Sequence, residues 1–305
     1  MPAWSQLRQE WLDWWRGAGA RGRWLPLAAI GLYYAVHVAL DGWRADPVLI
    51  GLGLLLFYYA GPRVRPLFRF LLPFAIVGMV YDAQRYWADE LRAEVRVAEP
   101  HEWEISWFGI EAEGESITPA AWWQTRTHPA LDLVCGAVYL VFLPAYLVMA
   151  AWWRFKERRR EADWTMWALM GMNLAGYATY LIYPAAPPWY VDQYGLGPAV
   201  LTAVPDAAGA ARFDALLGVE WFAGFYGHNA NVFGAIPSLH VAQTFLTMLF
   251  AWQFRSLRIT ATVYWLLMTF ASVYLNHHYL VDGIVGMVFA LLAWLAVWPQ
   301  VRNRN

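Results

Sequence analysis

The chain has 305 residues, of which 60% are hydrophobic and 21 are tryptophans, far more apolar surface than one soluble core can bury. A formal net charge of −1, with basic residues scattered among apolar runs, excludes a general nucleic-acid-binding surface. Cys135 is the single cysteine, which excludes an internal disulfide and a thiolate zinc cluster.

Apolar runs long enough to cross a bilayer recur along the whole chain. The first follows four arginines and has no small-residue cleavage site after it, so we interpret it as a membrane helix and not as a signal peptide. Eight spans are predicted, at residues 24–41, 47–60, 66–86, 129–153, 164–183, 237–254, 258–276 and 279–298. The second is short enough to be a re-entrant or interfacial segment instead. The predicted fold class is all-α, a polytopic membrane helical bundle of about eight transmembrane helices.

The distribution of charge predicts the topology. Basic residues gather in alternate loops such as "RFKERRREAD", whereas acidic residues concentrate in 82–128. Because cytoplasmic loops accumulate Lys and Arg, both termini are predicted to be cytoplasmic. Since no linker separates folding units, we expect a single membrane domain over 1–305. Its parts are a cytoplasmic segment 1–23, accessory and first core spans 24–86, an outer loop with an interfacial segment 87–128, core spans 129–298 and a cytoplasmic tail 299–305.

Three polar clusters are predicted to meet at the outer face of this bundle. "YPAAPPWY" at 183–190 leaves the fifth span, "PSLH" at 237–240 opens the sixth, and "NHHYLVD" at 276–282 connects the seventh to the eighth. Pro237 and Ser238 also fit a plain helix start, with serine as the cap. Asp282 is different, because a carboxylate inside an apolar span is costly and by default marks function.

The spacing of His278 and Asp282 indicates a catalytic pair. They are one helical turn apart, so the carboxylate can accept a hydrogen bond from one ring nitrogen and leave the lone pair of the other for a substrate. His277 is rotated away, which makes His278 the candidate nucleophile, and His240 arrives from another span as a separate acid or base. Two histidines and an orienting carboxylate match phosphoryl transfer through a phosphohistidine.

Zinc is an alternative for the same residues. His240, His278 and Asp282 also suit a metal ion with an open fourth position. The sequence lacks the local His-Glu-x-x-His pattern of helical metalloproteases, so we rank the metal site behind covalent catalysis.

"FGAIPSLH" followed by "HHYLVDGIVG" resembles the two C-terminal signatures of the type 2 phosphatidic acid phosphatase superfamily of membrane enzymes. With "YPAAPPWY", the chain is similar to the branch that contains inositol phosphorylceramide synthases and related sphingolipid synthases. The resemblance covers residues 129–298. It implies a six-helix catalytic core, His278 as nucleophile on phosphorus, Asp282 orienting it, His240 as general acid and then base, and no metal or other cofactor.

The sequence departs from the phosphatase pattern where a phosphate would be held. The only lysine, Lys156, lies in a basic loop, Leu239 replaces the glycine of Pro-Ser-Gly-His, and Ala271-Ser272 replace a Ser-Arg pair. The usual cationic clamp is therefore missing, which favours the synthase branch, and other donors must meet the charge of the phosphoryl group.

The residues predicted to bind substrate come from the three clusters and from two charged positions. They are Ser238, Asn276, His277, Pro187, Trp189, Tyr190, Asp132 and Arg212. Further candidate donors to the phosphoryl group are Arg126, His228, Asn229 and Asn231. Asp132, in the fourth span, is interpreted either as a site residue or as a packing residue satisfied by Tyr180 or Tyr183.

The sequence thus predicts a membrane lipid phosphotransferase. A phospho-headgroup, for example phosphoinositol, would pass from a phospholipid through His278 to a lipid hydroxyl such as that of ceramide, at the outer face of the membrane. The expected partners are lipid substrates and the bilayer, with no nucleic acid. One alternative is a lipid phosphatase that uses the same residues. Another is a transporter or lipid-binding protein in which the buried polar groups form an ion path.

Overall fold

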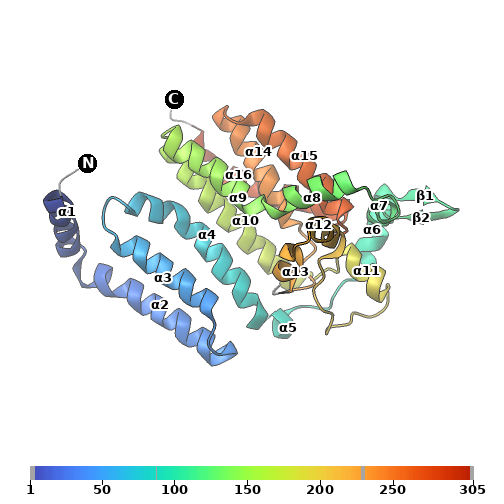
Figure 1. The fold of residues 1–305 in the computed structure, drawn as a ribbon, viewed down its shortest axis with the longest axis horizontal. Coiled ribbons are helices and arrows are strands. Elements are labelled where there is room, and N and C mark those ends of the chain that lie inside the picture. The colour runs from blue at the N-terminus through green and yellow to red at the C-terminus, as the bar shows by residue number, and fades with distance from the viewer. Residues whose placement is uncertain (1–3, 87, 228–230, 303–305) are drawn as a thin grey trace. The chain divides into compact units, whose positions relative to one another are not determined.

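The computed structural model describes residues 4–86, 88–227 and 231–302. The chain forms two compact units, Met1–Asp82 and Ala83–Asn305. The first unit contains α1 (Trp4–Gly17), α2 (Gly19–Asp41), α3 (Ala45–Tyr59) and most of α4 (Arg65–Ala83). Figure 1 shows α2, α3 and α4 as consecutive helices that reverse direction at each connection. Arg44, between α2 and α3, pairs with Asp82 near the end of α4 (Nη2 to Oδ1, 3.1 Å).

The second unit begins with the segment predicted to be an outer loop. It contains α5 (Ala88–Leu91), α6 (Ala98–Phe108), the antiparallel strands β1 (Ile110–Ala112) and β2 (Glu115–Ile117), and α7 (Pro119–Gln124). The strand pair was not predicted, and it is a small addition to an otherwise helical fold in the residues that the structure describes.

The long helices of the second unit lie where the sequence predicts the last five spans. They are α8 (Pro129–Leu140), α9 (Phe142–Ala151), α10 (Asp163–Ile182), α14 (Leu239–Phe254), α15 (Arg258–Tyr274) and α16 (Leu280–Val301). The described part of the predicted loop 184–236 contains the short α-helices α11 (Pro188–Tyr194), α12 (Ala211–Leu217) and α13 (Trp221–Tyr226).

The chain is an integral membrane protein. Within the described residues, three helical segments are long and apolar enough to cross a bilayer: Gly19–Leu40, Arg65–Tyr86 and Leu280–Val301. The pair α8 and α9 makes a fourth if it counts as one span bent by 54°. The bend lies where Pro144 cannot donate a helical hydrogen bond and its ring would clash with the carbonyl of Leu140. The total of eight spans and the single membrane domain stay predictions.

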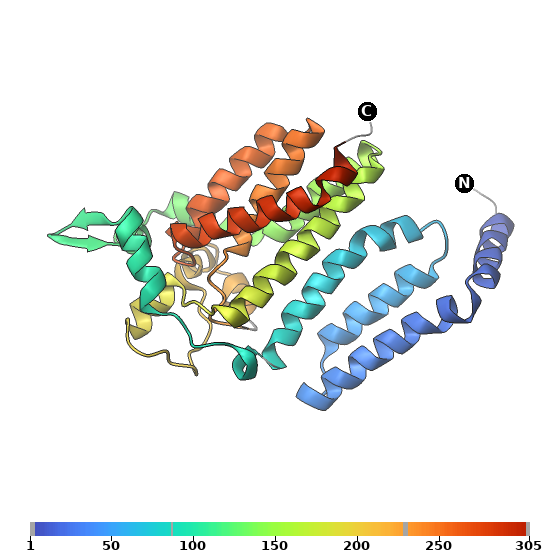
Figure 2. The same cartoon turned by 180° about the vertical axis from the view of Figure 1, so that it is seen from behind.

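The helices α14, α15 and α16 form the centre of the second unit. Helix α14 packs against both α15 and α16, α16 also contacts α10, and α15 contacts α8. Figures 1 and 2 show the short helices α6, α7, α11, α12 and α13 gathered at one end of these long helices, with the C-terminal end of α16 at the other. The loops that the sequence analysis assigned to one face therefore lie together.

Small residues let α14 and α16 approach closely at this end. A Cβ added to Gly286 would overlap the carbonyl oxygen of Ser238 and lie 3.4 Å from the Cβ of Ala242, and one added to Gly283 would meet Val241 at 3.5 Å. The backbones of the two helices are thus in direct contact, as is common where small residues face each other between membrane helices.

We expect Gly286→Ala to destabilise the protein by about 1–3 kcal/mol, because the new methyl group must push α14 away from α16. Thermal unfolding in detergent measures the change. Gly171→Ala on α10 is the matched control, since a Cβ there meets nothing within 4 Å. Equal stability of the two variants would contradict the close approach.

Candidate active site

Two helix starts carry the candidate catalytic residues. At the start of α14, Ser238 is the N-cap, and its hydroxyl oxygen accepts a hydrogen bond from Val241 N (3.4 Å). The Ser238 hydroxyl is thus engaged in the cap, and its contact with substrate stays a prediction. Leu239, in the place of the phosphatase glycine, packs over Gly176 of α10, where a Cβ would lie 2.8 Å from Leu239 Cδ2. A glycine on the neighbouring helix therefore makes room for this departure.

The turn between α15 and α16 places His278. Asn276 has φ +63°, the left-handed region that asparagine tolerates better than most residues. The backbone N–H groups of His277 and His278 both donate to the Ser272 carbonyl, each at 3.0 Å. The turn is thus held by backbone hydrogen bonds before any side chain of the site contributes.

Asp282 connects three elements of the site. Its Oδ2 lies 3.3 Å from His278 Nδ1 and accepts a hydrogen bond from Tyr279 N at 2.9 Å. Its backbone carbonyl accepts from Ser238 N at 2.9 Å, which joins the starts of α14 and α16. The sequence analysis placed Asp282 inside the span 279–298, and the residue lies in the first turn of the apolar helix α16, where a carboxylate also caps the helix.

His240 faces His278 from α14. His240 Nδ1 lies 3.3 Å from His278 Nε2 and 3.0 Å from the Tyr139 hydroxyl. If His278 Nδ1–H donates to Asp282, Nε2 carries a lone pair, and His240 Nδ1 must then carry the proton that points at it. The arrangement is a proton donor facing an oriented nucleophile.

His277 lies between two aromatic rings. It stacks on Tyr139 (centroids 5.1 Å apart, 12°) and on Tyr226 (4.6 Å, 11°). Burial, followed by the nearby His278, lowers the pKa of His277 to about 3. His277 is therefore neutral near pH 7, and its ring packs between the rings of Tyr139 and Tyr226. A contact of His277 with substrate stays a prediction.

A mostly apolar cavity of about 220 Å³ opens beside His240. It is lined by Tyr139 and the residues of the α8–α9 bend, together with Phe222, Phe225 and Tyr226 from α13. The bend in the fourth predicted span thus makes room next to the catalytic imidazole.

Asp132 and Arg212 form an ion pair on the neighbouring helices. Arg212 Nε donates to Asp132 Oδ1 (2.6 Å), and the other guanidinium nitrogens donate to Gln124 Oε1 (3.0 Å) and the Tyr274 carbonyl (3.2 Å). The Tyr274 hydroxyl also donates to Asp132 (2.8 Å). The partners of Asp132 are therefore Arg212 and Tyr274, so the expectation of Tyr180 or Tyr183 was wrong. The pair of Asp132 and Arg212 thus joins α8, α12 and α15. A contact of either residue with substrate stays a prediction.

"YPAAPPWY" reaches the other two clusters through the backbone. Trp189 N donates to the Asn276 carbonyl (3.1 Å), and Ala185 accepts from Ala235 N (3.3 Å). Pro187 is the N-cap of α11, and Trp189 and Tyr190 are buried in an apolar cluster with Val97, Ala186 and Phe233. The structure thus brings the three clusters together, with these two aromatic side chains in the packing beneath them.

The other candidate phosphate donors have protein partners where they are described. Asn276 Nδ2 donates to Asp192 (2.7 Å), Asn231 Oδ1 accepts from Phe233 N (3.0 Å), and Arg126 donates to Thr125 Oγ1 (2.7 Å). His228 and Asn229 lie outside the described residues. Within the ranges that are described, no group of three or more His, Cys, Asp or Glu is arranged to hold a metal ion, so the zinc alternative gains no support from them.

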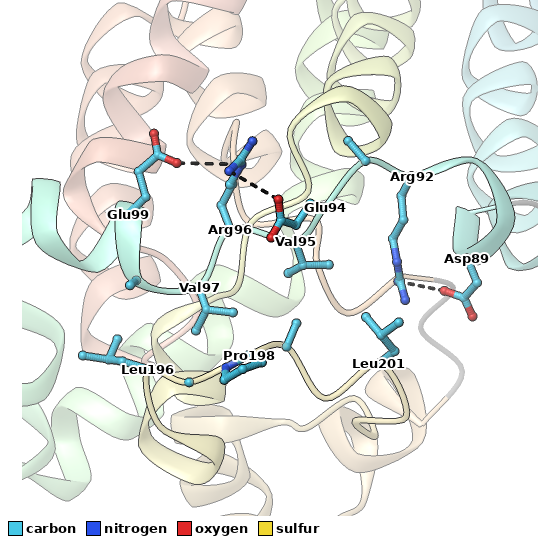
Figure 3. A pocket seen from close by; sticks show the side chains of 14 residues that line it. Asp89, Arg92, Glu94, Val95, Arg96, Val97, Glu99, Leu196, Pro198 and Leu201 are labelled. Atoms are coloured by element: carbon cyan, nitrogen blue, oxygen red, sulfur yellow. Dashed lines mark ion pairs between the residues drawn. The ribbon is translucent and has the colours of Figure 1, made fainter.

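A second pocket, of about 660 Å³, is lined by charged residues and by none of the site histidines. Figure 3 shows Arg92 beside Asp89, and Arg96 between Glu94 and Glu99. The loop that contains Leu196 and Pro198 lines the other side of the pocket. The closest of these ion pairs is Arg92 Nη1 to Asp89 Oδ1, at 2.7 Å. None of the residues predicted for the site lines this pocket.

The sequence analysis missed three residues that touch the site. Tyr139 contacts His240, Tyr226 stacks on His277, and Glu104 accepts hydrogen bonds from the first residues of α16. Tyr139 is two helical turns after Asp132, a spacing that puts both on one face of α8. Glu104 stands in the acidic segment 82–128, whose charge indicates the topology but not this contact.

Comparison with known proteins gives a consistent family. Residues 113–296, more than half of the chain, match the PAP2 superfamily. The chain is 32% identical over 272 residues to the phosphoinositol dihydroceramide synthase of Bacteroides thetaiotaomicron, covering 88% of this chain and 89% of that protein. No solved structure matches the chain significantly.

Fungal proteins match a shorter region. The inositol phosphorylceramide synthase catalytic subunit of Schizosaccharomyces pombe is 37% identical over 125 residues, and that of Saccharomyces cerevisiae 36% over 120 residues. These matches cover 41% and 39% of this chain but only 30% of each fungal protein. By the family match and the similarity to the bacterial synthase, the chain belongs to the PAP2 superfamily of membrane enzymes.

Proposed function

We propose that the chain is a lipid phosphotransferase that moves a phospho-headgroup, phosphoinositol first among the candidates, from a phospholipid to the hydroxyl of a ceramide-type lipid. The observation that carries the proposal is the row of three side chains in which Asp282 faces His278 Nδ1 and His240 faces His278 Nε2, each at 3.3 Å. The names of the bacterial and fungal relatives support the choice of headgroup and acceptor.

In the first step, His278 Nε2 attacks phosphorus. The N–P bond forms as the bond from phosphorus to the diacylglycerol oxygen breaks. His240 acts in its imidazolium form, gives its Nδ1 proton to the leaving oxygen and becomes neutral. The Asp282 carboxylate stabilises the positive charge that develops on the His278 ring. The phosphoryl group takes the place of the direct contact between the two histidines.

In the second step, the acceptor lipid enters with its hydroxyl beside His240. His240 Nδ1 removes the hydroxyl proton while the oxygen attacks phosphorus and the N–P bond breaks. Both histidines return to their starting protonation states, so the cycle balances without any cofactor.

The start of α14 helps to explain how an anionic headgroup is held without the usual Lys/Arg clamp. Helix α14 begins immediately beside His240, so the positive end of its dipole lies at the proposed phosphoryl position. The first N–H groups of α16 are instead taken by the carboxylates of Glu104 and Asp282. Arg212 is engaged with Asp132, Gln124 and the Tyr274 carbonyl. In this proposal the dipole of α14 takes over part of the role of the cationic clamp.

The cavity beside His240 suits the apolar part of a lipid. Its lining is largely aromatic and aliphatic, and the site lies at the end of the bundle that the distribution of basic residues assigns to the non-cytoplasmic side. We propose that the acceptor chain enters there from the bilayer, so that the hydroxyl reaches His240 while the tail stays in an apolar environment.

The decisive experiment identifies the products of purified protein incubated with phosphatidylinositol, with and without dihydroceramide. We expect inositol phosphoryldihydroceramide and diacylglycerol in equal amounts, and strong dependence on the acceptor. Free inositol phosphate released at the same rate without acceptor would favour the phosphatase. Solute movement across vesicles with no phosphoester consumed would favour the transporter.

Separate substitutions of His278 and Asp282 distinguish the roles of the two residues. We expect His278→Ala to abolish turnover, and Asp282→Asn to lower kcat on the order of a hundredfold or more, because asparagine keeps the Tyr279 cap but not the charge. Wild-type protein given donor alone should carry acid-labile phosphorus on His278, detected by mass spectrometry. Normal turnover by folded His278→Ala protein would exclude His278 as the nucleophile.

Tyr139→Phe removes the hydroxyl that contacts His240 and should lower kcat about three- to tenfold, the usual effect of one lost neutral hydrogen bond. Tyr146→Phe is the matched control, since its hydroxyl donates to the Thr165 carbonyl (2.6 Å) and its loss should reduce stability but not kcat. An equal kcat for wild type and Tyr139→Phe would show that His240 needs no support from Tyr139.

A further inference from the structure

We propose that Glu104, from α6, is a positioning residue that holds the start of α16 and thereby keeps Asp282 aligned with His278. Glu104 lies outside the matched region 113–296. The inference rests on the proposed phosphotransfer for its kinetic test, although the geometry of the site can be tested without it.

Glu104 binds the two backbone groups that open α16. Its Oε1 accepts from Leu280 N (2.9 Å) and its Oε2 from Val281 N (3.1 Å). The first N–H groups of a helix have no partner within the helix. Together with the Tyr279 N–H on Asp282 (2.9 Å), two carboxylates thus satisfy three consecutive donors.

This division of donors leaves Asp282 available to His278. Without Glu104, the N–H groups of Leu280 and Val281 would be buried without partners, or the first turn of α16 would rearrange to bring them to Asp282. Either change would weaken the contact between Asp282 Oδ2 and His278 Nδ1. Within the described residues, the hydrogen bonds given for the Glu104 carboxylate come from backbone N–H groups, and its charge also acts on nearby Asp282. Its effect on the reaction therefore passes through the pair of Asp282 and His278.

Burial of Glu104 is costly, which argues for a specific role. The side chain is fully buried, and burial raises the pKa of its carboxyl to about 7 although both N–H donors favour the charged form. A nearby serine or aspartate would cap a helix at a lower cost in desolvation. A carboxylate from a distant segment also links α6 to the start of α16, the helix that carries Asp282.

Aromatic packing holds α6 in place for this contact. The Trp103 ring stacks on Tyr183 (centroids 6.0 Å apart, 5°). Trp103 and Trp107 also line an apolar cavity of about 350 Å³ with Val281 and the next turns of α16. Glu104 therefore projects from a helix that is itself packed against α16.

The kinetic test compares Glu104→Gln with Glu102→Gln. Glutamine at 104 offers one acceptor oxygen and turns an NH₂ group toward the other N–H, whereas Glu102 is exposed on the same helix. We expect Glu104→Gln to lower kcat on the order of tenfold with KM for phosphatidylinositol unchanged, and Glu102→Gln to behave as wild type. Unchanged kcat with only a lower melting temperature would overturn the proposal, because the contact would then be structural alone.

A second measurement needs no turnover. Diethylpyrocarbonate modifies histidine ring nitrogens, and mass spectrometry gives its rate at His278 relative to the exposed His128. We expect this ratio to change severalfold in Glu104→Gln and to stay at the wild-type value in Glu102→Gln. An unchanged ratio in both variants would overturn the positioning role. A changed ratio in a protein that transfers no phospho-headgroup would instead reject the proposed function and leave the positioning role standing.

Discussion

The hydrogen bond from Ser238 N to the Asp282 carbonyl (2.9 Å) fixes the geometry on which the rest of the site depends. It joins the first residues of α14 and α16, and it forms only because Gly286 lets the two backbones touch. His240 stands two residues after Ser238, and His278 four residues before Asp282. The separation of the two imidazoles is therefore set by backbone contact, which is stiffer than any contact between long side chains.

Each buried carboxylate around the site has a specific partner, although Asp282 Oδ1 has none among the described residues. Asp282 is shared between His278 and Tyr279 N, Glu104 takes two backbone N–H groups, and Asp132 takes Arg212. In an apolar surrounding an unpaired carboxylate would be expensive. Each of these carboxylates also joins elements that are distant in the sequence, so the same groups that carry charge hold the helix ends together.

Aromatic rings pack against His240 and His277. Tyr139 stacks on both His240 and His277, and Tyr226 covers the far side of His277. The rings restrict the imidazoles without competing for the lone pair of His278. They also form part of the wall of the cavity beside His240, so the packing that orients the catalytic groups borders the space proposed for the lipid.

The sequence by itself determined the helical class, the positions of the long helices and the pairing of His278 with Asp282, because these follow from local periodicity and from spacing along one chain segment. It did not give the partners of Asp132, the role of Glu104, the contact of Tyr139 with His240, or the hairpin and short helices in the two loops. Those depend on which distant segments meet. Arg212 lies 80 residues from Asp132, and Glu104 lies 176 residues from Leu280. Only the tertiary structure decided these contacts, because a buried charge takes whatever partner the packing of the helices brings to it, and no local pattern records that choice.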